Sequence, residues 1–256
     1  MRLITKTILL LLTPLILVAC EQKKTVENEL TESVVTQEAE RNLGIASHEN
    51  SILVPAAGWG NMKFEPPVPG TYDLPIFGDA GDGWVLTQDG ERKRLSDFFG
   101  DKIVIMSFIY TQCSDLNGCP LVTAVFYKIK QRLLANPELA DKIRLISLSF
   151  DPKHDTPEVM KFYGQGSQDM GGLEWQFLTT ESEDELFPIT ESFGQYVNRE
   201  YDDKGNQTSN FAHILRVFLI DQNGKKRSQY SAGFLHEQSL LSDVKTVLMD
   251  ELQEDQ

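Results

Sequence analysis

The sequence predicts an α/β fold in which helices flank a central mixed sheet and a hairpin precedes it. Residues 102–110 and 142–150 form two continuous apolar runs, which are typical of strands buried on both faces of a sheet. Between these runs, apolar side chains recur at helical spacing over residues 121–134. A strand, a helix and a second strand in this order form a right-handed crossover, so we expect the two strands to be parallel.

The remaining elements are predicted from shorter signals. Residues 84–87 and the Asp-Gly turn that follows indicate the leading hairpin. Residues 155–157 have the order of a helix start, with Asp155 as the cap and Pro157 in the first turn. The elements expected after this start are a helix to about residue 163, a strand at 174–178, a helix at 181–193 that includes Pro188, a strand at 213–221, a strand at 228–232 and a closing amphipathic helix at 238–252.

The N-terminus resembles a bacterial lipoprotein signal. Arg2 and Lys6 precede a short apolar stretch that ends in Leu-Val-Ala before Cys20. This stretch is shorter than the roughly 20 residues of a membrane-spanning helix, which favours a cleaved signal over an anchor helix. We therefore expect residues 1–19 to be removed and Cys20 to be lipidated. The protein would then be anchored in the bacterial cell envelope, facing the periplasm or extracytoplasmic side.

Composition divides the mature chain. Residues 21–50 are rich in Glu, Lys, Thr, Gln and Ser with few large apolar residues, so they cannot bury enough surface to fold alone. Five prolines lie between residues 51 and 75, which indicates a semi-extended stretch that packs onto the domain behind it. We expect residues 20–70 to form a lipidated tether and residues 71–256 to form one domain.

The charge balance excludes some classes of partner. Without Arg2 and Lys6 the chain has 22 basic residues against 38 acidic ones, a net charge of −16. An acidic surface repels phosphate, so nucleic acid is not an expected partner. The sequence has no glycine loop with a lysine of the phosphate-binding kind, so nucleotide binding is not expected either.

The only cysteines besides Cys20 lie in one short loop. Cys113 and Cys119 stand in Tyr-Thr-Gln-Cys-Ser-Asp-Leu-Asn-Gly-Cys-Pro, between the first buried strand and the helix. In an extracytoplasmic compartment, thiols tend to be oxidised or bound to metal. Gly118 permits unusual backbone angles, and the helix N-terminus beside Cys119 favours its thiolate. The sequence therefore indicates that the chemistry of the chain belongs to this pair.

Three ordered motifs resemble the Sco/SenC family. They are Phe-Ile-Tyr-Thr-Gln-Cys with a later Cys-Pro at residues 108–120, Ser-Phe-Asp-Pro-Lys-His-Asp-Thr-Pro at 149–157, and a histidine, His213, before Val-Phe-Leu-Ile-Asp-Gln-Asn-Gly at 217–224. The resemblance implies a thioredoxin-like fold and a membrane-tethered copper protein that helps to assemble the dinuclear copper site of a respiratory cytochrome oxidase. By position, it also implies that Cys113, Cys119 and His213 bind copper.

The implied ligand set suits copper and its transfer. Thiolates are soft ligands for Cu(I), and an imidazole accepts both Cu(I) and Cu(II). Three protein ligands leave one side of the metal open, so we expect ligand exchange with a cytochrome oxidase subunit or another copper acceptor. The family motif has three residues between the cysteines, whereas this chain has five, residues 114–118. The longer loop leaves the family assignment in place but makes the copper geometry a separate question.

Other interpretations of the cysteine pair remain open. A structural disulfide across so short a loop would contribute only about 2 kcal/mol. A thiol–disulfide oxidoreductase would use Cys113 and Cys119 as its catalytic pair, and a metal-free scaffold or redox sensor is a third class. General oxidoreductases of the thioredoxin fold normally have a two-residue spacer and a facing cis-proline. Here the spacer is longer and no proline follows Pro188.

Two aspartates and the other histidines are secondary candidates. We expect Asp151 and Asp155 to be structural, with Asp155 as the cap of the following helix. The alternative is that they shape the copper pocket or accept a hydrogen bond from His213. His154 is interpreted as an exposed loop residue or an auxiliary metal contact. We expect His236 and His48 to lie on the surface.

Overall fold

The computed structural model describes residues 54–254, and the described residues from Pro55 onward form one compact unit. The predicted signal, Cys20, His48 and most of the predicted tether lie outside the described residues. Within residues 54–254, no helix has the length and apolar character needed to cross a membrane.

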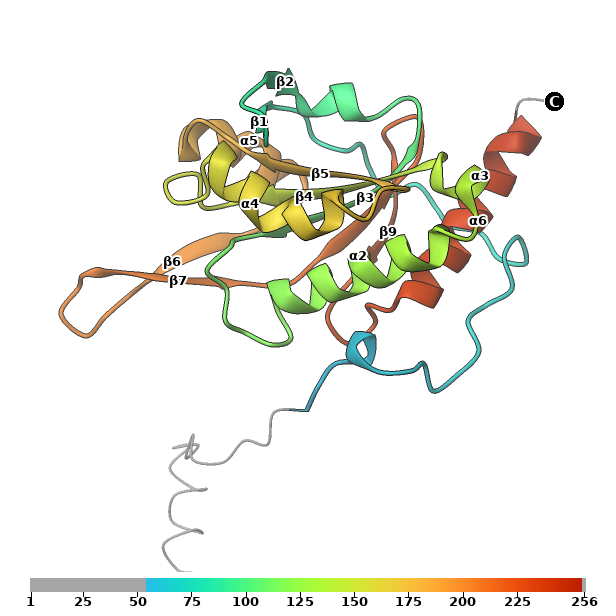
Figure 1. Ribbon diagram of the computed structural model, residues 1–256, viewed down its shortest axis with the longest axis horizontal. Helices are drawn as coiled ribbons and strands as arrows, with labels where there is room; N and C mark the ends of the chain where they lie inside the picture. The colour runs from blue at the N-terminus through green and yellow to red at the C-terminus, as the bar shows by residue number, and fades with distance from the viewer. Residues whose placement is uncertain (1–53, 255–256) are drawn as a thin grey trace, which may run out of the picture. The chain divides into compact units, whose positions relative to one another are not determined.

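A seven-stranded mixed sheet forms the centre of the unit (Figure 1). Its strands are β1 (Trp84–Thr87), β2 (Arg92–Arg94), β3 (Ile103–Ile109), β4 (Ile143–Ser149), β5 (Glu174–Thr179), β8 (Val217–Ile220) and β9 (Lys226–Tyr230). They lie in the order β2-β1-β5-β4-β3-β8-β9, with β3, β4 and β5 parallel and the other neighbours antiparallel. The sheet confirms the predicted leading hairpin and the parallel crossover.

Helices cover both faces of this sheet. They are α2 (Cys119–Leu133), α3 (Pro137–Ala140), α4 (Pro157–Gln168), α5 (Glu183–Ser192) and α6 (Glu237–Glu254), with short 3-10 helices η1 (Ala57–Trp59) and η2 (Leu95–Phe98). Thr123 of α2 and Tyr163 of α4 share a hydrogen bond of 2.7 Å, so these two helices cover the same face (Figure 1). Phe193 at the end of α5 contacts Phe108 and Phe218 on the opposite face.

The burial of β3 and β4 accounts for the two continuous apolar runs in the sequence. Every residue of β3 and of β4 is buried, because helices lie over both sides of the strands. Phe126 of α2 is fully buried and contacts Trp175 of β5 edge to face, with ring centroids 5.6 Å apart. The buried sheet therefore gives a fixed base to the loop that leaves the end of β3.

A separate two-stranded ribbon projects from this unit (Figure 1). It consists of β6 (Val197–Tyr201) and β7 (Gln207–His213), which pair antiparallel with each other. The prediction of one strand over residues 213–221 is wrong, because His213 ends β7 and β8 begins four residues later at Val217. Of the seven residues of β7 only Phe211 is buried, so this strand lacks the continuous apolar run of the central sheet.

Residues 55–75, here called the N-terminal strap, pack along α2 and α6 as predicted for the proline-rich stretch. Gly58 lies so close to α2 that a Cβ there would stand 2.7 Å from Cγ2 of Val125. Lys128 donates a hydrogen bond to the carbonyl oxygen of Gly58 at 2.6 Å. Farther along the strap, the backbone N–H of Gly70 donates to Oγ1 of Thr246 in α6 at 3.1 Å.

Two local predictions are corrected by the structure. Thr156 caps α4 and Asp155 does not, since Oγ1 of Thr156 accepts from the backbone N–H of Val159 and the carboxylate of Asp155 is engaged elsewhere. His236 is 2% exposed and is not a surface residue. Its Nδ1 accepts a hydrogen bond from the backbone N–H of Gln238 in the first turn of α6, and its Nε2 lies 3.3 Å from the carbonyl oxygen of Gly60 in the strap.

Candidate metal centre

The two cysteines come from the end of β3 and the start of α2. Beyond the strand the chain turns, and the backbone N–H of Cys113 donates to the carbonyl of Tyr110 at 3.3 Å. A second turn closes with the backbone N–H of Gly118 on the carbonyl of Asp115 at 2.9 Å. Cys119 is then the first residue of α2, and a proline follows it in the first turn, where a missing N–H costs nothing.

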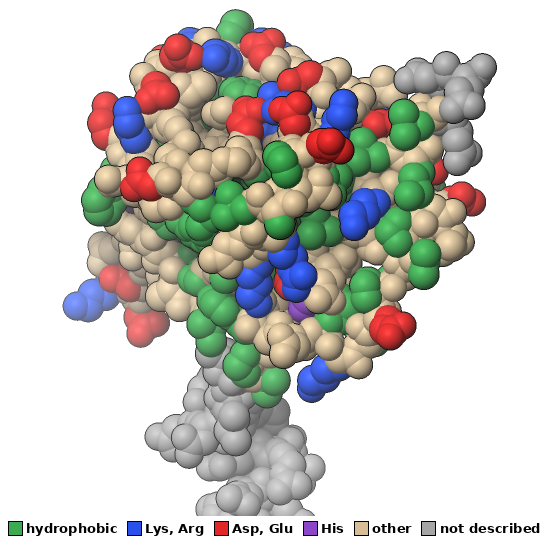
Figure 2. Space-filling view, turned by 45° about the vertical axis from the view of Figure 1, so that its right-hand side comes forward, with side chains coloured by type: hydrophobic (Ala, Val, Ile, Leu, Met, Phe, Trp, Pro, Cys, Tyr) green, Lys and Arg blue, Asp and Glu red, His purple; other side chains and the backbone are tan. Residues whose placement is uncertain are grey.

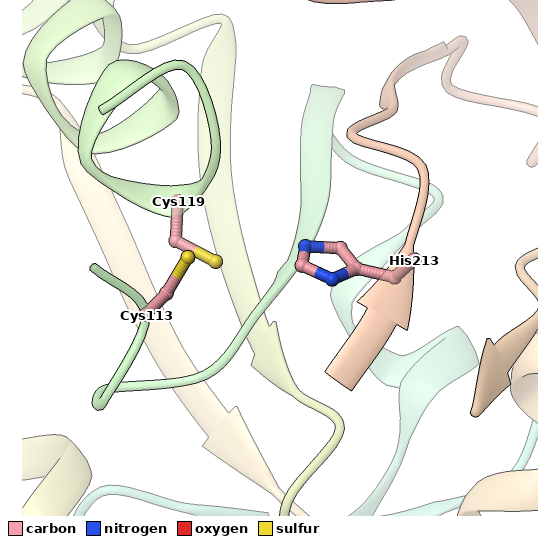
Figure 3. A group of neighbouring side chains, drawn as sticks. All are labelled: Cys113, Cys119 and His213. Carbon is pink, nitrogen blue, oxygen red and sulfur yellow. The ribbon is translucent and has the colours of Figure 1, made fainter. Parts of the chain in front are cut away.

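The structure brings all three predicted ligands together. The two sulfur atoms and a ring nitrogen of His213 lie within 4.8 Å of one another. In Figure 3, the edge of the imidazole ring points toward the two sulfur atoms. Cys119 lies on the helix, Cys113 on the loop and His213 at the end of β7. Both thiols are free, Cys119 is buried, and Cys113 and His213 are half-buried. Such a set can hold a soft metal ion while one side stays accessible.

Aromatic rings and a backbone carbonyl hold the imidazole of His213. The ring centroid lies 4.9 Å from that of Phe150 and 5.7 Å from that of Tyr110. Nδ1 stands 3.1 Å from the carbonyl oxygen of Phe211, a contact that requires Nδ1–H and leaves Nε2 as the ligand atom. The acceptor for His213 is thus a carbonyl, and neither Asp151 nor Asp155 fills that role.

Electrostatics make the two thiols unequal. The Cys119 thiol donates a hydrogen bond to the Cys113 sulfur. Together with the backbone N–H groups of Cys119 and Asp115, this bond outweighs the effect of burial and lowers the pKa of Cys113 to about 5. The same hydrogen bond, together with burial, raises the pKa of Cys119. The sequence predicts that the helix N-terminus favours the thiolate of Cys119, and this prediction is wrong. The helix N-terminus favours that of Cys113 instead, because its N–H group points at the neighbouring sulfur.

Tyr110 is a site residue that the sequence did not single out. It is 5% exposed, and burial followed by the negative charge of Cys113 raises the pKa of its phenol. The hydroxyl donates a hydrogen bond to the Cys113 sulfur and so helps to hold the thiolate. A tyrosine three residues before a cysteine, at the end of a buried strand, is the signal that could have found it.

The five-residue spacer has anchors of its own. Oδ1 of Asn117 accepts from the backbone N–H of Ala56 at 2.9 Å, and the carbonyl of Leu116 accepts from Nε1 of Trp59 at 3.1 Å. Both donors belong to the N-terminal strap. The longer loop is therefore fixed against the strap, which lets the two thiols converge in spite of the added residues.

His154 does not join the cluster. Its Nδ1 lies 2.9 Å from Oδ2 of Asp151, and its side chain is 41% exposed, as expected for a loop residue. Among residues 54–254, one group of three or more His, Cys, Asp or Glu side chains has donor atoms that converge as a metal site requires. It is formed by Cys113, Cys119 and His213.

An open surface lies beside His213. A shallow cavity of about 340 Å³ is lined by residues that include Tyr196, Ile214 and Arg216. Tyr196 is 78% exposed and Ile214 is 63% exposed, so apolar side chains border the histidine on the solvent side. Figure 2 shows that hydrophobic and basic side chains also meet on one face of the compact unit. A partner could reach the ligands from the side of this cavity.

The sequence motifs and this geometry agree with a family comparison. Residues 78–249, more than half of the chain, match the family model described as SCO1/SenC. The chain belongs to the SCO1/SenC family. Among curated proteins, the SCO1 protein homolog of Bacillus subtilis is 30% identical over 164 residues, which cover 62% of this chain and 77% of that protein.

Solved structures of Sco proteins share the fold. A SCO1/SenC family lipoprotein from Bacillus anthracis has a TM-score of 0.55 at 24% identity, covering 70% of this chain and 98% of that one. Arabidopsis thaliana ScoI with copper bound has a TM-score of 0.53 at 19% identity, covering 67% and 99%. BsSco, described with a disulfide switch and as a member of the Sco family of cytochrome c oxidase assembly proteins, has a TM-score of 0.50 at 24% identity, covering 72% and 98%. These likenesses confirm the predicted thioredoxin-like fold.

Proposed function

We propose that this protein is a copper metallochaperone that binds one copper ion through Cys113, Cys119 and His213. The observation that carries the proposal is the convergence of two thiols and one imidazole, from a loop, a helix and a ribbon, within 4.8 Å. Soft thiolates with one imidazole suit Cu(I) and also accept Cu(II). The copper-bound relative from Arabidopsis thaliana supports the choice of metal.

The unequal thiols and the open side of the site support a role in copper delivery. Cys113 is already a thiolate at neutral pH, so it is the first ligand, whereas Cys119 must release its proton as the metal binds. His213 closes the set from the ribbon. An acceptor ligand that enters beside His213 displaces one protein ligand at a time, so that the ion never becomes free. We propose a cytochrome oxidase subunit as the acceptor, by analogy with the assembly role named for BsSco.

A competition titration tests the binding site. Residues 55–256, reduced and free of oxygen, are titrated with Cu(I) against a chelator of known affinity, beside the variants Cys113→Ser, Cys119→Ser and His213→Ala. Tight binding of one ion that every substitution weakens supports the three-ligand site. Binding that is weak in the parent protein, or indifferent to His213, contradicts the copper proposal.

We also propose that residues 1–19 are cleaved and that lipid on Cys20 anchors the protein in the cell envelope. The likeness to a lipoprotein of Bacillus anthracis supports this location. The test compares the parent protein with Cys20→Ala in fractionated bacterial cells. Loss of the protein from the membrane fraction in the variant agrees with lipid anchoring. Equal amounts of both proteins in the membrane fraction contradict it.

A second candidate, a thiol–disulfide reductase, is favoured by the lowered pKa of Cys113 beside the Cys119 thiol. The Cys113 thiolate would attack a target disulfide to form a mixed disulfide and release one target thiolate. Cys119 would then lose its proton, attack Cys113 and release the second thiolate, so two electrons pass to the target. Reduction of a disulfide in the acceptor protein, lost in Cys113→Ser and trapped as a mixed disulfide in Cys119→Ser, would support this activity.

A further inference from the structure

The loop after β4 carries two buried carboxylates that point to different halves of the candidate metal centre. Asp151 and Asp155 are each 1% exposed. A buried carboxylate is costly unless charged or polar partners satisfy it, so its partners show what it holds in place. Neither carboxylate bonds a metal ligand directly. Each one bonds the segment that carries a ligand.

Asp155 holds the start of the cysteine loop. Its Oδ2 accepts from the backbone N–H of Thr111 at 3.0 Å, and its Oδ1 accepts from the Thr111 hydroxyl at 2.5 Å. The hydroxyl of Ser149, at the end of β4, donates to the same carboxylate at 2.5 Å. Since Thr111 precedes Cys113 by two residues, these bonds tie the exit of β3 to the exit of β4 just before the thiolate.

Asp151 holds the ribbon that ends in His213. Its Oδ1 accepts from Nη2 of Arg199 in β6 at 2.9 Å, and the guanidinium is 11% exposed. The same guanidinium lies 4.2 Å from the ring centroid of Phe211, whose carbonyl oxygen fixes the imidazole. The ribbon shares no strand pairing with the seven-stranded sheet, so this ion pair and the ring contacts of Phe211 with Tyr110 and Phe150 attach it beneath the ligand. The same guanidinium also lies 3.5 Å from Oε1 of Glu183 in α5.

We propose that Asp151 and Asp155 are separate positioning residues, Asp151 acting through Arg199 on His213 and Asp155 acting through Thr111 on Cys113. The inference rests on the proposed copper site and adds what sets its geometry. A role for Asp155 as helix cap does not compete with it, because Thr156 already caps α4. Metal sites depend on groups that fix the orientation of their ligands, and the two carboxylates do so for opposite sides of one site.

The test asks whether each substitution disturbs only the half of the site that its carboxylate holds. Full-length protein in detergent is prepared as Asp151→Asn, Asp155→Asn and the control Asp89→Asn, which removes an exposed ion pair with Lys161. Two measurements need no metal: the rate of alkylation of Cys113, followed by mass spectrometry, and hydrogen exchange of residues 207–213. A third records nitrogen coupling from the imidazole in the electron paramagnetic resonance of the Cu(II)-loaded protein.

We expect Asp151→Asn to lose exchange protection in the ribbon and nitrogen coupling, with an unchanged alkylation rate. Asp155→Asn should change the alkylation rate and leave the ribbon protected. Each should weaken Cu(I) binding by about 10- to 100-fold, the effect typical of residues that orient metal ligands. The proposal would be overturned if both variants changed both metal-free measurements, because that is a general effect on the fold. It would also be overturned if neither variant changed either measurement.

Two milder variants cover the case in which the asparagine proteins fail to fold. Arg199→Gln removes the ion pair and keeps most of the side-chain length, and Thr111→Val removes only the hydroxyl donor. Arg199→Gln is expected to act like Asp151→Asn, and Thr111→Val like Asp155→Asn. Changes in both metal-free measurements in both variants, or in neither, would again overturn the proposal. If the parent protein binds no copper, the proposed function fails, whereas alkylation and exchange still decide whether the two carboxylates act separately.

Discussion

The cysteine half and the histidine half of the candidate centre are built differently. The cysteines follow β3, which is buried along its whole length and pairs with a strand on each side. His213 ends a two-stranded ribbon in which a single residue of its strand, Phe211, is buried. Local stability follows buried contacts, so the histidine half opens more easily than the cysteine half. The contrast is consistent with the proposed transfer of copper, because a soft metal could stay with the thiols while the third ligand is exchanged.

The largest expected contrast is in stability. Phe126→Ala removes a fully buried ring from the helix that begins with Cys119, and it should lower the free energy of unfolding by about 3–5 kcal/mol. Tyr201→Ala removes a ring that is 60% exposed on the ribbon, and it should change this energy by less than about 0.5 kcal/mol. Urea unfolding of both variants measures the difference. Similar losses in the two proteins would mean that the ribbon is part of the core.

The next prediction concerns the thiols alone. Cys119→Ala removes the main cause of the lowered pKa of Cys113, so this pKa should rise from about 5 toward the ordinary value of about 8.5. The ultraviolet absorbance of the thiolate, followed against pH in the metal-free reduced protein, measures it. His213→Ala is the matched control and should leave the pKa of Cys113 near 5. A rise in the control would place the histidine half in electrostatic contact with the thiolate.

The same group makes stability depend on pH. Because folding lowers the pKa of Cys113 to about 5, the folded state binds fewer protons than the unfolded chain between that pH and about 8.5. Stability contributed by this group is therefore present at the upper end of the window and is lost as the pH falls through 5. Urea midpoints at both ends of the window should differ less in Cys113→Ser than in the parent protein. An unchanged difference would assign the pH dependence to other groups.

The smallest predicted effect concerns the spacer between the two cysteines and its contact with the N-terminal strap. Trp59→Phe keeps the apolar contact of the ring and removes its hydrogen bond to the carbonyl of Leu116, which should cost about 0.5–1.5 kcal/mol. Alkylation of Cys113 should become faster, while hydrogen exchange of residues 207–213 stays the same. If exchange in the ribbon rises as well, the strap stabilises both halves and the two are not independent.

The sequence was sufficient for the cysteine half because burial leaves a strong pattern. A run of apolar residues, a cysteine pair and helical spacing predicted β3, the loop and α2, and the family resemblance pointed to Cys113, Cys119 and His213. The ribbon could not be predicted in this way, since an exposed two-stranded element has little apolar periodicity. The segment Asp-Asp-Lys-Gly-Asn at residues 202–206 is a turn signal that could have revealed it.

Other details depend on contacts between segments far apart in the chain. Asp155 has the local order of a helix cap, and only its bonds to Thr111 and Ser149 show its actual place. The identity of the thiolate depends on which sulfur accepts the hydrogen bond of the other thiol and those of the N–H groups in the loop and helix, which spacing alone does not determine. Tertiary contacts decided both cases over local preference.

The strap constrains how an acceptor can approach. Trp59 and Ala56 cover the spacer through Leu116 and Asn117, so that flank of the thiols is already occupied by the protein's own chain. The flank beside His213 is bordered by the exposed side chain of Ile214. A docking protein would therefore meet an entrance on one side only, which would select its orientation before any ligand is exchanged. Under the proposed function, the residues that lead into the domain would act as a steric guide for the protein that receives the metal.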